Sequence, residues 1–305
     1  MTFELKHLCL ALSLAALPAL SVAQTAPTAV QQHASVTVLA SLPVTHALAS
    51  ALLDGTSVTL QRAAPANLPA SRQPSYFSGR GGASLQKAAS QADAVIALRS
   101  IWSDDPLYPV ARRSNIRIVE IDAARPVDGA LPGIAVQGNN AFAAYPWLNP
   151  TNLGRMADVL ANDLGRLSPS EQPKIQANLA SFKRQLLELS ATSESRLAEA
   201  DNLSVVNLSE RLDYLISGLN LDLIDHPRVA DDQWDDAALK RLGEELKGQD
   251  VALVLHHKQP SPAVQEVIKE SGAKLVVIDT EAPDTVAGLK ASVEQVVEAL
   301  IPTKA

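Results

Sequence analysis

The sequence predicts an α/β fold of two lobes, each with a central, mostly parallel sheet flanked by helices. Short apolar stretches alternate with helical segments on both sides of one long helix. Stretches that are apolar throughout are typical of parallel strands buried on both faces. The long helix has no glycine between Glu171 and Ala200. We therefore expect one rigid helix to join the lobes, with a ligand cleft between them.

The N-terminal segment has the pattern of an export signal. An apolar run at 8–20 is followed by Ser21-Val22-Ala23, the small residues of a cleavage site. We predict a signal peptide over residues 1–23, a flexible leader over 24–34, and a soluble mature protein in the periplasm. Cys9 is the single cysteine and falls within the predicted signal peptide, so no disulfide or cysteine metal ligand is expected.

The overall composition bounds the class of protein. A chain of 305 residues has room for two domains, and an apolar fraction of 47% is ordinary for a globular protein. The formal net charge of −7 and the lack of a basic stripe argue against a nucleic-acid partner. We expect a monomer that binds a small solute.

The first lobe is predicted over residues 35–147. Its strands are expected at 35–40, 58–60, 94–98 and 117–121. Helices are expected from Pro43 to Gly55 and over 83–92, and a long loop rich in proline and glycine over 63–82.

A helical segment, including the long linking helix, is predicted over residues 148–200. An amphipathic helix runs to Leu167, and Ser168 with Glu171 has the form of a capping box. If the second helix continues to Ala200, it is about 45 to 50 Å long at 1.5 Å per residue.

The alternation resumes in the second lobe, predicted over 201–305. Its expected strands are 203–207, 250–255 and 274–278, and its expected helices are 211–219, 235–247, 261–271 and 284–300. Ligands of parallel sheets bind beyond the carboxyl ends of the strands. The loops expected to form the site are therefore 41–46, 65–82, 139–147, 207–211, 256–260 and 279–283.

Several segments resemble the solute-binding proteins of zinc and manganese ABC importers, the helical-backbone metal receptors of cluster A-I. Pro146-Trp147-Leu148-Asn149-Pro150 is similar to the family's Pro-His-x-Trp-Leu-Asp-Pro segment. The stretches 91–95, 214–221 and 270–279 resemble further family segments in the same order. The resemblance implies two lobes joined by a rigid helix, and delivery of a transition metal to an ABC permease in the inner membrane.

The sequence departs from this family at the expected metal ligands. The family holds its ion with three histidines and a carboxylate, and the matching histidine positions here are Ser75, Tyr145 and Ser209. The carboxylate corresponds to Asp279, and His257 stands where the family often has glutamate. This chain resembles a divergent member that lacks the three usual histidines.

The remaining candidate metal ligands are His256, His257 and Asp279. Zinc binds imidazole and carboxylate, usually with four ligands, so this set supplies three at most. Lys258 next to them opposes a cation. The alternative is that the histidines are exposed loop residues and that Asp279 caps a turn.

A second set of candidates suits an organic or chelated solute. Neutral hydroxyls hold a ligand by hydrogen bonds, and arginines beside a glycine-rich helix start favour anions. The predicted ligand-cleft residues are Ser75, Tyr76, Tyr145, Ser209, Arg72 and Arg80. The alternative is a solvated surface loop.

Three functional hypotheses follow. The first is a periplasmic receptor that delivers zinc or manganese, bare or as a metal chelate, and closes modestly around it. The second is a divergent accessory protein that binds no metal and acts on a metal-uptake system through protein contacts. The third, an exported enzyme, has the least support, because the sequence has no G-x-S-x-G, no H-E-x-x-H and no thiol in the mature chain.

Overall fold

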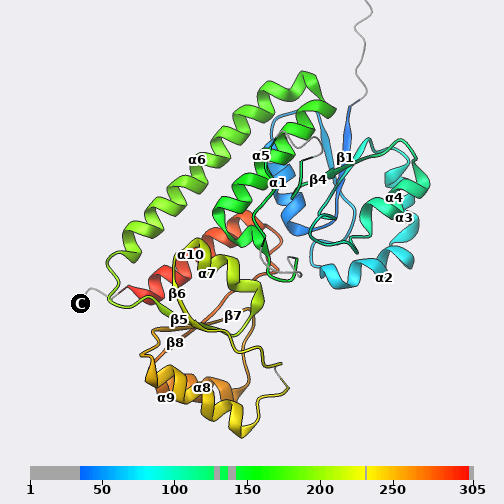
Figure 1. Cartoon of the computed structure of the whole chain (residues 1–305). Coiled ribbons are helices and arrows are strands. Elements are labelled where there is room, and N and C mark those ends of the chain that lie inside the picture. Colours follow the sequence, from blue (N-terminus) through cyan, green and yellow to red (C-terminus); the bar gives the residue numbers. More distant parts are fainter. Residues whose placement is uncertain (1–34, 127–130, 137–141, 231, 302–305) are drawn as a thin grey trace, which may run out of the picture. The chain divides into compact units, whose positions relative to one another are not determined.

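A computed structural model describes residues 35–126, 131–136, 142–230 and 232–301 (Figure 1). The predicted signal peptide and leader lie outside the described residues. Within the described part of the chain, no helix is long and apolar enough to cross a membrane.

Two four-stranded parallel sheets form the framework. The first has the order β2-β1-β3-β4, from β1 (Thr37–Ala40), β2 (Thr59–Arg62), β3 (Ala94–Ala97) and β4 (Val119–Asp122). The second has the order β6-β5-β7-β8, from β5 (Ser204–Asn207), β6 (Asp222–Asp225), β7 (Leu253–His256) and β8 (Lys274–Val277). We call the two sheets with their adjoining helices the first and second lobes. The predicted two-lobed α/β fold is confirmed.

The helices occupy the segments between the strands and the long link. The α-helices are α1 (Pro43–Leu53), α2 (Gln73–Ser78), α3 (Gly82–Ala89), α4 (Leu107–Ser114), α5 (Pro150–Leu167), α6 (Gln172–Leu197), α7 (Asp213–Gly218), α8 (Asp236–Gly248), α9 (Pro262–Ser271) and α10 (Thr285–Leu300). Short 3-10 turns are η1 (Ala70–Arg72), η2 (Pro146–Leu148), η3 (Pro169–Glu171) and η4 (Glu210–Leu212).

Each sheet is covered on both faces. Successive side chains of a strand point to opposite faces, so Val38 packs on one side of the first sheet and Leu39 on the other. The outer face of the first sheet packs against α3 and α4, and that of the second against α8 and α9. The inner faces of both sheets share one apolar cluster with α1, α5, α6, α7 and α10, which we call the central core.

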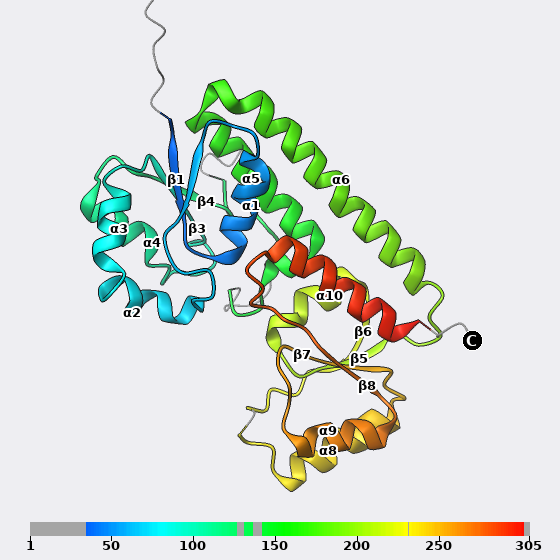
Figure 2. The ribbon, with the colours of Figure 1, turned by 180° about the vertical axis from the view of Figure 1, so that it is seen from behind.

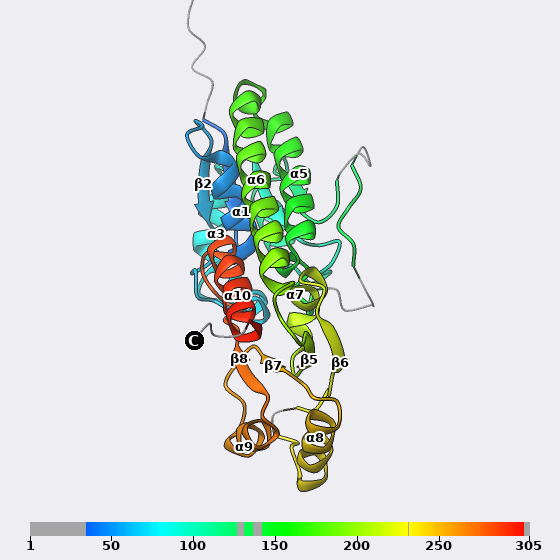
Figure 3. The same ribbon diagram turned by 90° about the vertical axis from the view of Figure 1, so that its left-hand side faces the viewer.

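The helix α10 belongs to this central core although it ends the described chain. It lies beside α6 and α1, as Figures 2 and 3 show, and contributes Leu289, Val293 and Val297 to the cluster. The lobes are therefore connected both by α6 and by the return of α10 to the first lobe.

The predicted long helix exists but is shorter than expected. The 26 residues of α6 span about 39 Å at 1.5 Å per residue. The predicted capping box is wrong, because the side chain of Ser168 caps no backbone N–H and Glu171 instead accepts a hydrogen bond from Ser57 Oγ at 2.7 Å. The local pattern predicted that the Glu171 carboxylate caps a helix, but it bonds to a residue of the first lobe instead.

Two further segments differ from the prediction. The expected loop at 63–82 contains η1 and α2, which form because Gln73 and Phe77 are buried against the lobe. The edge strand β6 was missed, because its residues are mostly exposed and carry acidic side chains at both ends. An exposed edge strand lacks the apolar run by which the buried strands were recognised.

Candidate functional site

The carboxyl ends of β5, β7 and β8 meet at one edge of the second sheet. Ser209 follows β5 and His257 follows β7, and their side chains share a hydrogen bond of 2.7 Å between Oγ and Nδ1. The loop after β8 brings Thr280 and Glu281 to the same edge. The expected location of the site, beyond the strand ends, therefore gathers hydroxyl, imidazole and carboxylate groups.

The neighbouring histidine is part of the packed structure. His256 is buried, and its Nδ1 accepts a hydrogen bond from the backbone N–H of Lys258 at 3.0 Å. Its ring stacks on that of His257, with 4.8 Å between centroids. Because Nδ1 accepts, a neutral His256 ring carries its proton on Nε2.

Tyr145 reaches this edge from the segment before α5. Its hydroxyl donates a hydrogen bond of 2.7 Å to Glu281 Oε1, and its ring packs 4.7 Å from that of Trp147. Burial, followed by the carboxylate of Glu281, raises the pKa of the Tyr145 phenol well above its ordinary value. The hydroxyl therefore stays protonated and acts as a donor.

Arg211 completes the cluster. Its guanidinium donates to Glu281 Oε1 at 2.6 Å and to Thr280 Oγ1 at 3.2 Å, and it lies 5.0 Å from the centre of the Tyr145 ring. Glu281 thus accepts from a phenol and a guanidinium at once. We call Tyr145, Arg211 and Glu281 the inter-lobe cluster.

The cluster leaves little room between the lobes. A cavity of about 20 Å³ lies beside it, close to the volume that one water molecule needs. Its lining residues are Leu42, Pro43, Val44, Ala70, Phe142, Tyr145, Trp147, Thr280, Glu281 and Thr285. They come from the start of α1, from Ala70, from the segment 142–147 and from the segment 280–285, and the small volume shows that the described structure is closed at this point.

The predicted metal ligands are not gathered around one point. Asp279 is exposed, and its carboxylate accepts the backbone N–H of Glu281 at 2.9 Å, the turn-capping role given above as the alternative. Among the described residues no three His, Cys, Asp or Glu side chains form a group that could hold a metal ion. Ligation by His256, His257 and Asp279 stays a prediction that requires a rearrangement.

The predicted residues of the first loop lie on α2 and beside it. The ring of Tyr76 packs against Phe77 at 5.4 Å and under the Arg80 guanidinium at 5.6 Å. Ser75, Arg72 and Arg80 are exposed. None of these four predicted residues lines the inter-lobe cavity, to which this loop contributes Ala70. Of the predicted cleft residues, the structure thus brings Tyr145 and Ser209 to the edge of the second sheet.

Sequence reasoning missed Arg211, Thr280 and Glu281. The only available signal was their place in the loops 207–211 and 279–283, which were expected to form the site. Arginine and glutamate are common on any surface, so their types alone gave no reason to choose them.

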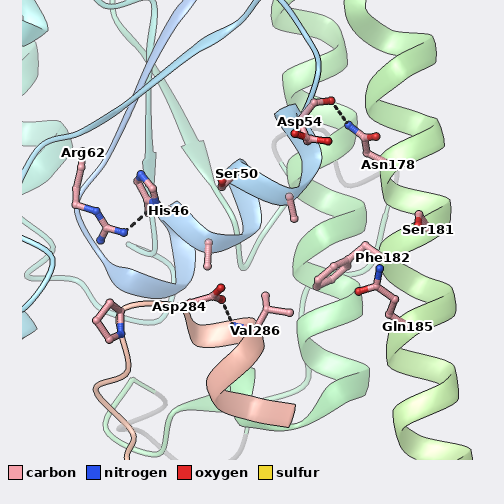
Figure 4. A pocket seen from close by; sticks show the side chains of 13 residues that line it. His46, Ser50, Asp54, Arg62, Asn178, Ser181, Phe182, Gln185, Asp284 and Val286 are labelled. Atoms are coloured by element: carbon pink, nitrogen blue, oxygen red, sulfur yellow. Dashed lines mark hydrogen bonds between the residues drawn. The ribbon is translucent and has the colours of Figure 1, made fainter. Parts of the chain in front are cut away.

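A larger cavity of about 560 Å³ opens between α1, α6 and the start of α10 (Figure 4). On one side Arg62 Nη2 donates to His46 Nδ1 at 2.9 Å, and on the other Asn178 holds the end of α1 through the carbonyls of Leu52 and Asp54. Burial and the charge of Arg62 lower the pKa of His46. His46 belongs to the segment 41–46, which was expected to help form the site, and the structure places it at this second cavity.

The two-lobed fold and the position of the polar cluster between the lobes are typical of one class of protein, the two-lobed solute-binding proteins. A family model described as "ZnuA: Zinc-uptake complex component A periplasmic" matches residues 83–299, more than two thirds of the chain. The chain therefore belongs to the family of periplasmic components of zinc-uptake complexes.

Solved structures support the fold. A ZnuA crystal structure shares 21% identity over 87% of this chain and 99% of its own, with a TM-score of 0.64. The solute-binding protein FpvC of Pseudomonas aeruginosa in complex with Ni²⁺ shares 20% identity over 88% and 97%, with a TM-score of 0.63. The laminin-binding protein Lbp of Streptococcus pyogenes shares 16% over 87% and 99%, also at 0.63. A search of curated protein sequences finds no match.

Proposed function

We propose that this chain is the periplasmic receptor of an ABC importer, which captures a transition metal between its lobes and delivers it to an inner-membrane permease. The observation that carries the proposal is the inter-lobe cluster. Polar groups of both sides of the cleft converge there at the carboxyl edge of the second sheet. Family membership supplies the context, since the family model describes a periplasmic zinc-uptake component.

The proposed solute is zinc or manganese, bare or carried by a chelator. Solved relatives include a zinc-bound ZnuA variant and FpvC in complex with Mn²⁺. In the bare form, His257 and Asp279 are the proposed ligands, with His256 as a third, because imidazole and carboxylate are the donors that zinc accepts in proteins. In the chelated form, Tyr145 and Ser209 contact the organic part of the solute.

Entry of either solute requires the lobes to separate. The bond between Tyr145 and Glu281 joins the two sides of the small cavity, so it must break first. The shared central core limits how far the lobes move, and we propose a modest opening and closing rather than a wide hinge. The alternative function is a divergent accessory protein that binds no metal and acts on a metal-uptake system through protein contacts.

Zinc binding to the mature, chelator-stripped protein tests the proposal. We expect a dissociation constant below about 1 μM, some 8 kcal/mol of binding free energy, for zinc added either as the ion or as its citrate complex. His257→Ala should weaken binding at least tenfold, about 1.4 kcal/mol. Asp222→Ala removes an exposed carboxylate of β6 and should leave binding unchanged. Competition against a chromophoric chelator measures the ion, and calorimetry measures the citrate complex.

Failure to bind zinc in both forms would contradict the receptor proposal and favour the accessory protein. Binding that survives His257→Ala would keep the receptor but remove His257 from its site.

A further inference from the structure

We infer that Arg211 makes the inter-lobe site select an anionic metal chelate over a bare divalent cation. The inference rests on the proposed function and deepens it by naming the chemical class of the solute. It assigns a specificity role to Arg211, a residue that the resemblance to metal receptors did not single out.

Glu281, the carboxylate that lines the small inter-lobe cavity, already has a cationic partner. Arg211 contacts Glu281 at 2.6 Å and is held in place by Thr280 Oγ1 at 3.2 Å. Both partners are half-exposed, with side-chain exposures of 32% for Arg211 and 44% for Glu281. Their charges therefore compensate each other within the second lobe, and the position does not depend on a metal for neutrality.

A bare divalent ion meets two obstacles at this position. It has to displace the guanidinium from Glu281, and the displaced guanidinium keeps its charge, because arginine does not lose its proton in proteins. The hydrogen bond to Thr280, which lies in the same lobe, holds that charge close by. Like charges at such short range repel, so the ion is disfavoured.

An anionic chelate has to displace Glu281 from Arg211, but Glu281 is 44% exposed and loses its bond to Tyr145 when the lobes open, so its carboxylate can turn to solvent. Its carboxylates offer the planar acceptors that a guanidinium binds with two parallel hydrogen bonds. The chelator already satisfies the metal, so the protein has no need to supply three ligands, in accord with the lack of such a group among the described residues. Tyr145 and Trp147 provide an aromatic wall at the same place.

The cluster also provides a sequence of events. Opening of the lobes breaks the bond between Tyr145 and Glu281, while the pair of Arg211 and Glu281 remains within the second lobe. A carboxylate of the incoming chelate then replaces Glu281 as the hydrogen-bond partner of Arg211. The resting site is thus closed by an internal carboxylate that imitates the solute.

Two variants that act in opposite directions test the inference. Arg211→Gln keeps a hydrogen-bond donor but removes the charge, and should raise the affinity for zinc ion at least tenfold while lowering that for zinc citrate at least tenfold. Glu281→Gln releases Arg211 from its internal partner, and should raise the affinity for zinc citrate without raising that for zinc ion. Calorimetry with each probe measures both, and circular dichroism checks that the variants fold.

Arg228→Gln is the matched control. Arg228 is 72% exposed and lies 4.0 Å from Glu210, so its loss removes the same charge from the same lobe outside the cluster. It should change neither affinity by more than about twofold. If wild type binds zinc ion below micromolar and Arg211→Gln leaves that affinity unchanged, the inference is overturned and the receptor stands. If neither probe binds wild type or any variant, the receptor proposal fails with it.

Discussion

Tyr145 combines a strained backbone with a central position in the site. Its φ of 48° lies in the left-handed region, which a non-glycine residue adopts only when its surroundings enforce it. The residue before a proline normally prefers extended backbone, and Pro146 follows directly. Packing on Trp147 and the bond to Glu281 hold the conformation. Strain at a residue proposed to contact the solute fits the proposal that this segment changes conformation when solute enters.

At the residue scale, His46 is expected to make the fold sensitive to acid. Burial and Arg62 lower its pKa below the ordinary 6.5, so the neutral ring is favoured in the folded state. As the pH falls below 6.5, the unfolded chain takes up the proton first, and the stability present above 6.5 is lost toward the lower folded pKa. Urea unfolding at pH 7.5 and 5.5 should show a smaller loss of stability for His46→Gln than for wild type.

Ser50→Ala is the control for this measurement, because Ser50 lines the same cavity and does not titrate. It should keep the full acid sensitivity of the wild type. An undiminished loss in His46→Gln would assign the acid sensitivity to other groups.

At the element scale, the side chains of the two residues that flank α5 are expected to contribute unequally to the free energy of unfolding. The side chain of Asn149 accepts the backbone N–H of Thr151 at 2.8 Å at the start of α5, whereas the side chain of Ser168 at its end makes no capping hydrogen bond. Asn149→Ala should therefore cost about 1 kcal/mol of unfolding free energy. Ser168→Ala should stay within about 0.5 kcal/mol. Urea titration measures both, and equal losses would contradict the assignment.

Three of the strands that the sequence predicted have a burial that shows in the local sequence. Val205, Val254 and Ile96 lie in strands buried on both faces, and the unbroken apolar runs around them were recognised. The strand β6 failed this test because it is an exposed edge. The helix α2 failed because Gln73 and Phe77 become buried only through contact with distant segments.

The same distinction explains the candidate site. Topology predicted that the segments after β5 and β8 meet, and Ser209 and Tyr145 lie at that edge. The pairing of Arg211 with Glu281 depends on how two loops approach each other, 70 residues apart in sequence. No local pattern encodes such a contact, so the partners could not be chosen from the sequence.

At the scale of the whole molecule, we expect the lobes to unfold together. Leu48 of the first lobe and Leu215 of the second lie in one apolar cluster with Leu160 and Val293. If one lobe unfolded, the side chains of the other lobe in this cluster would become exposed to water. This coupling favours a single cooperative transition. Native-state hydrogen exchange should give equal opening free energies for the slowest amides of β1 and β7. Two distinct values, or separate thermal transitions, would show that the lobes are independent.

The return of α10 to the first lobe has a consequence for how the chain matures. Its residues pack against α1 and α6, yet α10 follows every other described helix in the sequence. Synthesis proceeds from the N-terminus. All strands of the first sheet are therefore made long before α10, the helix that packs on α1 and α6. The first sheet can form early, but the packing of α1 and α6 is completed only once α10 has been synthesised. The central core is therefore completed only after the strands of both lobes have been synthesised.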